Sequence, residues 1–231
     1  MATVLITGAN RGLGLEFCRQ YAENGWKVLA CCRHPEQASD LQDLAARHPR
    51  LSLHRLDLSR FEDIDTLARE LTAEPIDVLL NNAGVYGDAA HNRFGAMDYA
   101  QWTQVLRIDA LAPVKMAEAF LPHVKGSSRR LIVAVTSLMG SIGDNTSGGS
   151  ILYRSAKAAL NAAMKSLSID LREQGIGVLI LHPGWVRTDM GGPNAPTAPE
   201  ESIGGMRKII EGFTPRDSGR FLNFRGEELP W

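Results

Sequence analysis

The apolar and polar positions along the chain predict strands and helices in regular alternation. Short runs rich in Val, Ile and Leu predict strands at Val4–Ile6, Lys27–Cys31, Leu51–Leu56, Ile76–Leu80, Leu131–Val135, Val178–Leu181 and Arg220–Phe224. Most of these runs are continuously apolar, which is typical of parallel strands covered on both faces. Leu51–Leu56 instead alternates between apolar and polar residues, which indicates a strand near the edge of the sheet.

Longer segments with helical periodicity lie between the predicted strands, at Leu13–Asn24, Gln37–Arg47, Phe61–Leu71, Tyr99–Leu121, Leu152–Gln174 and Glu200–Glu211. Gly25 and Gly175 follow the first and fifth of these, where glycine commonly ends a helix. The alternation is typical of an α/β protein with helices on both faces of a doubly wound parallel sheet. The 231 residues suit one such domain. We therefore expect residues 1–231 to form a single-domain Rossmann fold of about seven strands.

Two stretches rich in Pro, Gly and polar residues interrupt this pattern, at Ser141–Ser150 and Gly191–Pro199. Neither is long enough to be a domain linker. We interpret the first as a loop bordering the functional site. The second predicts a mobile substrate flap over about residues 188–212.

Composition excludes several classes of function. The net charge of -1 and the scattered basic residues argue against a nucleic-acid partner. No apolar run approaches the roughly 18 residues that a membrane span needs, and no secretory signal opens the sequence. Cys18, Cys31 and Cys32 form no disulfide framework, and neither they nor the histidines have metal-ligand spacing. We expect a cytoplasmic protein without a metal site.

A glycine-rich segment follows the first predicted strand and leads directly into a helix. Its glycines are Gly8, Gly12 and Gly14. Glycine lets the backbone turn sharply close to a pyrophosphate, and the helix N-terminus offers N–H donors to the anion. The G-x-x-x-G-x-G spacing is looser than the usual dinucleotide fingerprint, and a plain strand-to-helix turn is the alternative. Its position after the first strand favours a dinucleotide site.

The end of the second predicted strand indicates which dinucleotide binds. NAD sites usually carry an acidic residue there, whereas this chain reads Cys31-Cys32-Arg33-His34. Arg33, together with Arg11 of the glycine-rich segment, is suited to hold a 2′-phosphate. We predict a preference for NADP(H) over NAD(H), the alternative being that both arginines are ordinary surface charges.

Tyr153 and Lys157 are four residues apart on a predicted helix and therefore share one face. A cation about 4 Å from a phenol, at an effective dielectric constant near 20, is worth about 4 kcal/mol. That interaction predicts a phenol pKa lowered by up to roughly three units, which suits a general acid. Ser137 follows a buried strand, where its hydroxyl would reach a substrate carbonyl oxygen. Asn81-Asn82-Ala83-Gly84 follows the neighbouring strand and either supports the cofactor or forms a turn.

Together these motifs resemble the short-chain dehydrogenase/reductase family. The resemblance extends to Pro183–Met190, which is similar to the family's P-G-x-V-x-T segment. The segments Ser218–Phe221 and Leu229–Trp231 resemble the subgroup of C-factor-like proteins and small carbonyl reductases. The resemblance implies that Tyr153 is the acid/base, that Lys157 lowers its pKa and holds the nicotinamide ribose, and that Ser137 orients the substrate.

The family resemblance also implies a cofactor-binding set and one departure. With Tyr153 and Lys157, the set comprises Gly8, Asn10, Arg11, Gly12, Leu13, Gly14, Arg33, Asp57, Leu58, Asn82, Ala83, Gly84, Pro183, Gly184, Val186 and Thr188. The family usually has a catalytic Asn where this chain has Asp109 in Ile108-Asp109-Ala110-Leu111-Ala112-Pro113. A buried Asp near Lys157 is expected to alter the pH optimum.

We therefore expect an NADPH-dependent oxidoreductase that acts on a carbonyl or alcohol. Besides Ser137, the residues expected around the substrate are Tyr86, Met139, Ser141, Trp185 and Met190. Their mainly apolar character indicates a small hydrophobic aldehyde or ketone. The alternatives are a C-factor-like signalling or cofactor-sensing protein and a structural dimerisation module. The two longest predicted helices, rich in Ala and Leu, would pair in a homodimer or homotetramer, as the family does.

Overall fold

The computed structural model describes residues 2–72, 74–88 and 94–231, which form one seven-stranded sheet. The strand order is β3-β2-β1-β4-β5-β6-β7, and all neighbouring pairs are parallel. The strands are β1 Thr3–Thr7, β2 Lys27–Cys32, β3 Leu51–Arg55, β4 Val78–Asn81, β5 Leu131–Val135, β6 Gly177–His182 and β7 Phe221–Asn223. The predicted Rossmann fold is confirmed, with the alternating strand β3 at one edge.

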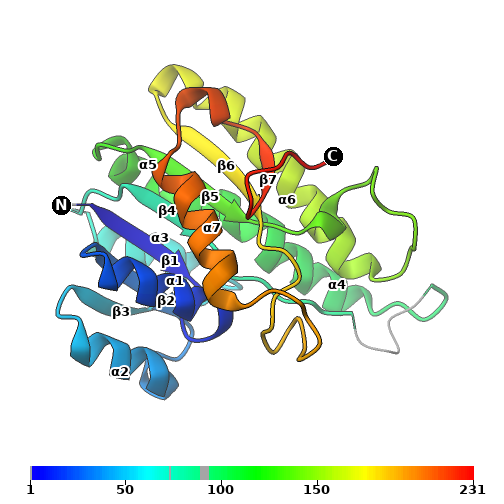
Figure 1. The fold of residues 1–231 in the computed structure, drawn as a ribbon, viewed down its shortest axis with the longest axis horizontal. Helices are drawn as coiled ribbons and strands as arrows, with labels where there is room; N and C mark the ends of the chain where they lie inside the picture. The colour runs from blue at the N-terminus through cyan, green and yellow to red at the C-terminus, as the bar shows by residue number, and fades with distance from the viewer. Residues whose placement is uncertain (1, 73, 89–93) are drawn as a thin grey trace.

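Helices cover both faces of the sheet (Figure 1). They are α1 Gly12–Glu23, α2 Ser39–Arg47, α3 Phe61–Glu70, α4 Tyr99–Leu106, α5 Ala112–Lys125, α6 Ile151–Asp170 and α7 Pro199–Glu211. α1, α2 and α7 enclose one core with the sheet, and α3, α5 and α6 enclose the other. Each face of every central strand is thus buried, which explains why these strands are continuously apolar.

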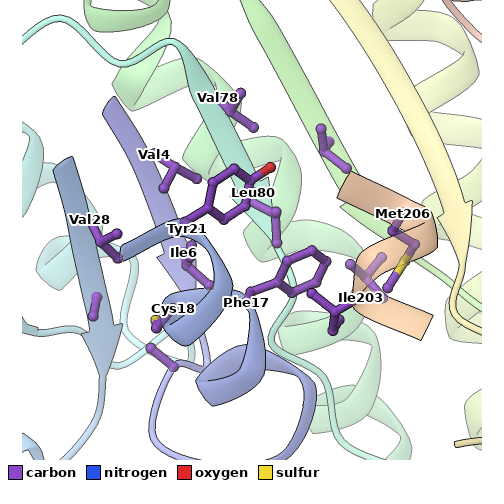
Figure 2. Packing of buried hydrophobic residues seen from close by; sticks show 14 of the residues in the cluster. Val4, Ile6, Phe17, Cys18, Tyr21, Val28, Val78, Leu80, Ile203 and Met206 are labelled. Atoms are coloured by element: carbon purple, nitrogen blue, oxygen red, sulfur yellow. The ribbon is translucent and has the colours of Figure 1, made fainter. Parts of the chain in front are cut away.

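The core beneath α1 and α7 is built from large apolar side chains (Figure 2). Phe17 and Tyr21 of α1 are fully buried against the strands, beside Ile203 and Met206 of α7. α7 lies within the segment predicted as a substrate flap, and it packs against α1. Residues 188–198, ahead of this helix, form mainly turns. Thr197 within them makes a β-bridge with Val186.

The predicted helix Tyr99–Leu121 is present, but its α-helical hydrogen bonding is interrupted. Between α4 and α5 the backbone forms a π-helical turn over Arg107–Leu111, and α5 continues to Lys125. A π-turn inserts an additional residue into the helical ladder and is often found at functional sites. It turns Asp109 into the protein interior, where the residue is fully buried.

The sheet order changes direction between β1 and β4, because the chain first adds β2 and β3 on one side of β1 and then continues from β4 on the other. In open parallel sheets such a point leaves a crevice at the carboxyl ends of the strands, where ligands bind. None of the described helices is both long and apolar enough to cross a membrane.

Candidate active site

Tyr153 and Lys157 lie in the first turns of α6, where both are almost completely buried. The Lys157 Nζ atom is 5.5 Å from the centre of the Tyr153 ring. The predicted juxtaposition of phenol and ammonium is therefore present. The ammonium also donates a hydrogen bond of 3.4 Å to the carbonyl oxygen of Val135, at the end of β5.

The carboxylate of Asp109 lies next to the buried ammonium of Lys157. Its Oδ2 atom is 3.1 Å from Lys157 Nζ, while its Oδ1 atom accepts a 2.8 Å hydrogen bond from the backbone N–H of Val85. The Lys157 contact is a close ion pair and not a well-aligned hydrogen bond, since Oδ2 has no partner of suitable geometry in the described part of the chain. Gly84 lies beside this pair, and a Cβ atom there would be 3.1 Å from both charged atoms.

Ser137 lies next to the phenol because a short 3-10 turn follows β5. Its Oγ atom accepts a 3.1 Å hydrogen bond from Met139 N–H, and the hydroxyl lies close enough to Tyr153 to lower the pKa of the phenol. The turn ends at Gly140, where a Cβ atom would be 2.8 Å from the backbone carbon of Lys157. Only glycine permits this close approach between the turn and α6. Ser137, Tyr153 and Lys157 thus meet at the carboxyl edge of β5.

The electrostatics of Tyr153 correct one expectation from the sequence. Burial raises the pKa of the phenol, and the raising effect of Asp109 adds to it, while Lys157 and Ser137 only partly oppose this. The pKa of Tyr153 is therefore above its usual value, and not lowered by up to three units. The prediction considered the ammonium alone, whereas burial of the phenol and the nearby Asp109 carboxylate both act in the opposite direction.

Both members of the Lys157–Asp109 pair respond to burial and to each other. Burial alone would lower the pKa of Lys157, but the charge of Asp109 and the phenol outweigh burial and raise it. For Asp109, burial raises the pKa, and the lysine and the Val85 N–H oppose that shift. The raised pKa of the lysine keeps the ammonium charged at neutral pH.

Hydrogen bonds join the end of β1, just before the glycine-rich segment, to the Asn81–Gly84 segment at the end of β4. Thr7 Oγ1 accepts hydrogen bonds of 3.1 Å from the backbone N–H groups of Asn82 and Ala83, and Asn82 Nδ2 donates to the Thr7 carbonyl at 2.9 Å. Gly8 has φ +67°, and a Cβ atom there would be 2.9 Å from Ala83 Cα. Asn82 therefore supports the strand ends that frame the crevice.

The first turn of α1 is suited to an anion. Arg11 occupies the N-cap position without a side-chain cap, and no acidic residue lies in the first turn. A Cβ atom on Gly14 would be 2.0 Å from the Gly8 carbonyl oxygen, so glycine is required where the loop meets the helix. The exposed N–H groups and positive end of the helix fit the pyrophosphate of a dinucleotide.

Thr188 and Asp189 approach this loop from the segment after β6. The Thr188 methyl group is 3.6 Å from the position of a Cβ atom on Gly12. Arg11 Nη1 forms an exposed 2.8 Å ion pair with Asp189. Three further residues of this segment belong to the expected cofactor-binding set. Pro183 and Val186 are buried, and Gly184 has φ +84°. The end of the Pro183–Asp189 segment thus contacts the glycine-rich loop.

Arg33 is exposed at the end of β2, close enough to Asp57 to influence its carboxyl group. Burial opposes ionisation of Asp57, yet hydrogen bonds from Ser59, together with Arg33, lower its pKa. Leu58 is buried and Asn10 is exposed. Asp57, a member of the expected cofactor-binding set, therefore carries a carboxylate of lowered pKa beside the arginine predicted to hold the 2′-phosphate.

The residues expected around the substrate differ in how close they lie to Tyr153. The Tyr86 ring packs on the Tyr153 ring with a centroid distance of 5.1 Å, and its hydroxyl forms a 2.7 Å hydrogen bond with Ser150 Oγ. Trp185 and Met190 are more than half exposed. Ser141 is buried, and its Oγ accepts from Asp144 N–H. Tyr86 therefore packs directly on the phenol ring, whereas the Ser141 side chain stabilises the loop that contains it.

Sequence reasoning missed Asp88. Its carboxylate accepts hydrogen bonds from the backbone N–H groups of Leu152 at 3.2 Å and Tyr153 at 2.8 Å. Ser150, which precedes α6, has φ +44° and provides no side-chain cap. Because Asp88 caps a helix more than sixty residues later in the chain, no local sequence pattern indicates its role.

Comparisons with known proteins agree with this geometry. The family model for short chain dehydrogenases matches residues 2–198. The C-signal protein of Myxococcus xanthus is 45% identical over 164 residues, which cover 71% of this chain and 98% of that protein. The carbonyl reductase Sniffer of D. melanogaster has a TM-score of 0.94 at 37% identity, with both chains fully covered.

A second solved structure, the NADPH-bound carbonyl reductase from chicken fatty liver, has a TM-score of 0.92 at 34% identity. The alignment covers 100% of this chain and 99% of that one. The family model spans most of the chain, and the structural similarity extends over all of it. The chain belongs to the short chain dehydrogenase family and is an oxidoreductase of the carbonyl reductase-like group.

Proposed function

We propose that this chain is an NADPH-dependent carbonyl reductase for small, mainly apolar aldehydes or ketones. The observation that carries the proposal is the meeting of Ser137, Tyr153 and Lys157 at the carboxyl edge of β5. The similarity to carbonyl reductases, one of them bound to NADPH, supports this reaction class.

The proposed chemistry assigns one role to each side chain. When bound, a reduced nicotinamide would supply the hydride for the carbonyl carbon. Ser137 orients the carbonyl oxygen by a hydrogen bond, and Tyr153 donates the proton that converts this oxygen to a hydroxyl. Lys157 stabilises the phenolate left behind, because an ammonium close to a developing negative charge lowers its energy. The alcohol product has then gained one hydride and one proton.

The preference for NADP(H) rests on charge at the end of β2. Arg33 is exposed there, and β2 does not end in an acid that would hold a ribose 2′-hydroxyl. Arg11 lies at the start of α1, paired with Asp189 through an exposed contact that salt and solvent weaken. Both guanidinium groups are thus available to a 2′-phosphate, which is a doubly charged acceptor suited to them.

Measuring NADPH oxidation with a panel of small aldehydes and ketones tests the reaction. Tyr153→Phe should lower kcat by at least about 100-fold, because the acid is lost while the ring stays. Calorimetric binding of NADPH should be retained in this variant. Tyr99→Phe, which removes a hydroxyl from an exposed tyrosine, should leave turnover unchanged. Equal turnover in native protein and Tyr153→Phe would exclude the phenol as the acid.

A signalling or cofactor-sensing function is the second candidate, favoured by the 45% identity to C-signal. The complete set of Ser137, Tyr153 and Lys157 favours the enzyme, since sensing a dinucleotide needs no proton donor. Tight NADPH binding without turnover of any carbonyl compound would favour the second candidate.

We also propose that the chain forms a homodimer or homotetramer through α5 and α6. Two large apolar side chains near these helices, Leu111 and Ile169, are about half exposed. Light scattering coupled to size-exclusion chromatography measures the assembly, and a monomer would reject this proposal. The three cysteines are free and buried, which supports a reducing compartment such as the cytoplasm.

A further inference from the structure

The buried Asp109 carboxylate is a charge that the proposed reaction does not use directly. Asp109 is fully buried, and its Oδ2 atom lies 3.1 Å from the ammonium of Lys157. The same ammonium is close to the Tyr153 ring, its nitrogen 5.5 Å from the ring centre. The cation therefore has both a carboxylate and a phenol ring as near neighbours.

The backbone fixes this carboxylate in place. The π-helical turn Arg107–Leu111 directs Asp109 inward, and the Val85 N–H holds its Oδ1 atom at 2.8 Å. Gly84 leaves space for the pair, because a Cβ atom there would be 3.1 Å from both Asp109 Oδ2 and Lys157 Nζ. The ion pair is therefore built by two separate segments and does not depend on one flexible side chain.

We propose that Asp109 is a positioning residue that acts through Lys157: by pairing with the ammonium, it weakens the stabilisation that the ammonium gives to a Tyr153 phenolate and so favours carbonyl reduction over alcohol oxidation. Reduction requires the phenol as a proton donor, whereas oxidation requires the phenolate as an acceptor. Asp109 does not change the equilibrium of the overall reaction. It sets the pH range in which each direction is fast. This inference rests on the function proposed above and assigns it a direction.

Burial is the largest cause of the raised pKa of the phenol, and the Asp109 carboxylate is the charged group that adds to it. Lys157 and Ser137 both favour the phenolate, while Tyr86 from the loop after β4 acts in the same direction as Asp109 but as a neutral hydroxyl. Asp88 is bound to backbone N–H groups at the start of α6. Asp109 is the group whose charge directly competes with the phenolate for the ammonium, because burial leaves little solvent to screen either one.

Ultraviolet titration of tyrosinate absorbance tests the inference without turnover. The difference between native protein and Tyr153→Phe isolates one of the four tyrosines. We expect Tyr153 to remain protonated throughout the neutral range. In Asp109→Asn, measured against Asp109→Asn/Tyr153→Phe, the midpoint should fall by about one pH unit or more, since the phenolate no longer competes with a carboxylate.

Steady-state kinetics provide the second readout. In Asp109→Asn, the decline of reductase activity at high pH should begin at a lower pH by the same amount, and alcohol oxidation near neutral pH should rise. Asp170→Asn is the matched control, because it makes the same change at an exposed position at the end of α6. It should leave both the titration and the kinetic pH profile unchanged.

Two results would overturn the inference. One is a Tyr153 that already ionises near neutral pH in the native chain, a measurement that requires no folded Asp109 variant. The other is a folded Asp109→Asn whose tyrosinate midpoint is unmoved. If no carbonyl compound is reduced by the native chain, the proposed function fails, and the absorbance titration still decides the role of Asp109.

Discussion

Asp88 caps the helix that carries Tyr153, its Oδ2 atom accepting the backbone N–H of that tyrosine at 2.8 Å. The cap is supplied by the loop after β4 and not by the residue preceding the helix, because Ser150 is left-handed and its hydroxyl bonds Tyr86. The same loop thus fixes the helix end and packs a ring on the phenol. This ties the position of the proposed acid to the strand that borders the cofactor crevice.

Asp88→Ala should therefore destabilise the chain and impair turnover together. Losing a helix cap costs about 1 kcal/mol, and the freed helix end carries Tyr153 directly. Urea unfolding and kcat measure the two effects. Asp88→Asn retains an acceptor oxygen and should recover most of the stability. Native-like stability in Asp88→Ala would show that the cap does not hold the helix end.

Arg33→Ala should weaken NADPH selectively. A hydrogen bond between charged groups contributes about 1.5–3 kcal/mol, so the KM for NADPH should rise about 10-fold or more while the KM for NADH changes little. Arg172→Ala, at an exposed position after α6, removes the same charge as a control. Equal losses for the two cofactors in Arg33→Ala would contradict contact with a 2′-phosphate.

His182 should make stability sensitive to acid. Burial lowers its pKa from the usual 6.5 to about 4, with Asp144 opposing the shift. Because the unfolded chain takes up this proton first, the contribution of the neutral ring is fully present above about pH 6.5 and is lost as the pH falls to about 4. The loss amounts to about 2–3 kcal/mol for a largely buried ring.

His182→Gln should therefore show a smaller fall in unfolding free energy than native protein over that pH range. Denaturant unfolding at a series of pH values measures the difference. His34→Gln, which changes an exposed histidine, should follow the native curve. Parallel curves for native protein and His182→Gln would mean that the ring is not held neutral by the fold.

The architecture could be predicted from the sequence because strands that are buried on both faces of a sheet are continuously apolar. Every predicted strand is present, and the alternating run at Leu51 is the edge strand β3. Gly175 ends its helix segment with φ +68°. These features depend on local pattern and on rules for parallel sheets, which a single sequence carries.

What the sequence did not reveal depends on contacts between distant segments. The apolar periodicity continues through Arg107–Leu111, so nothing indicated the π-helical turn that buries Asp109. The pairing of Arg11 with Asp189 joins residues 178 positions apart. The predicted direction of the Tyr153 pKa shift was wrong because spacing identifies the lysine as a neighbour but shows neither how deeply the phenol is buried nor that a carboxylate lies nearby.

Trp231 should stabilise the loop that leads to α6. Its ring packs on Phe221 at 5.6 Å and lies 5.7 Å from the ammonium of Lys165, while its backbone oxygen accepts a 2.9 Å hydrogen bond from Gly143. Trp231→Ala removes the aromatic and cation–π contacts, together worth about 1–2 kcal/mol.

In Trp231→Ala the residues around Gly143 should lose this support, and a protease of broad specificity should cleave the segment 141–150 faster than in native protein. Trp231→Phe keeps an aromatic ring and should show a smaller effect in both urea unfolding and proteolysis. If Trp231→Ala loses stability but segment 141–150 is cleaved at the native rate, the ring stabilises β7 alone. The Gly143 hydrogen bond would then persist without it, since its acceptor is a backbone atom that the substitution leaves in place.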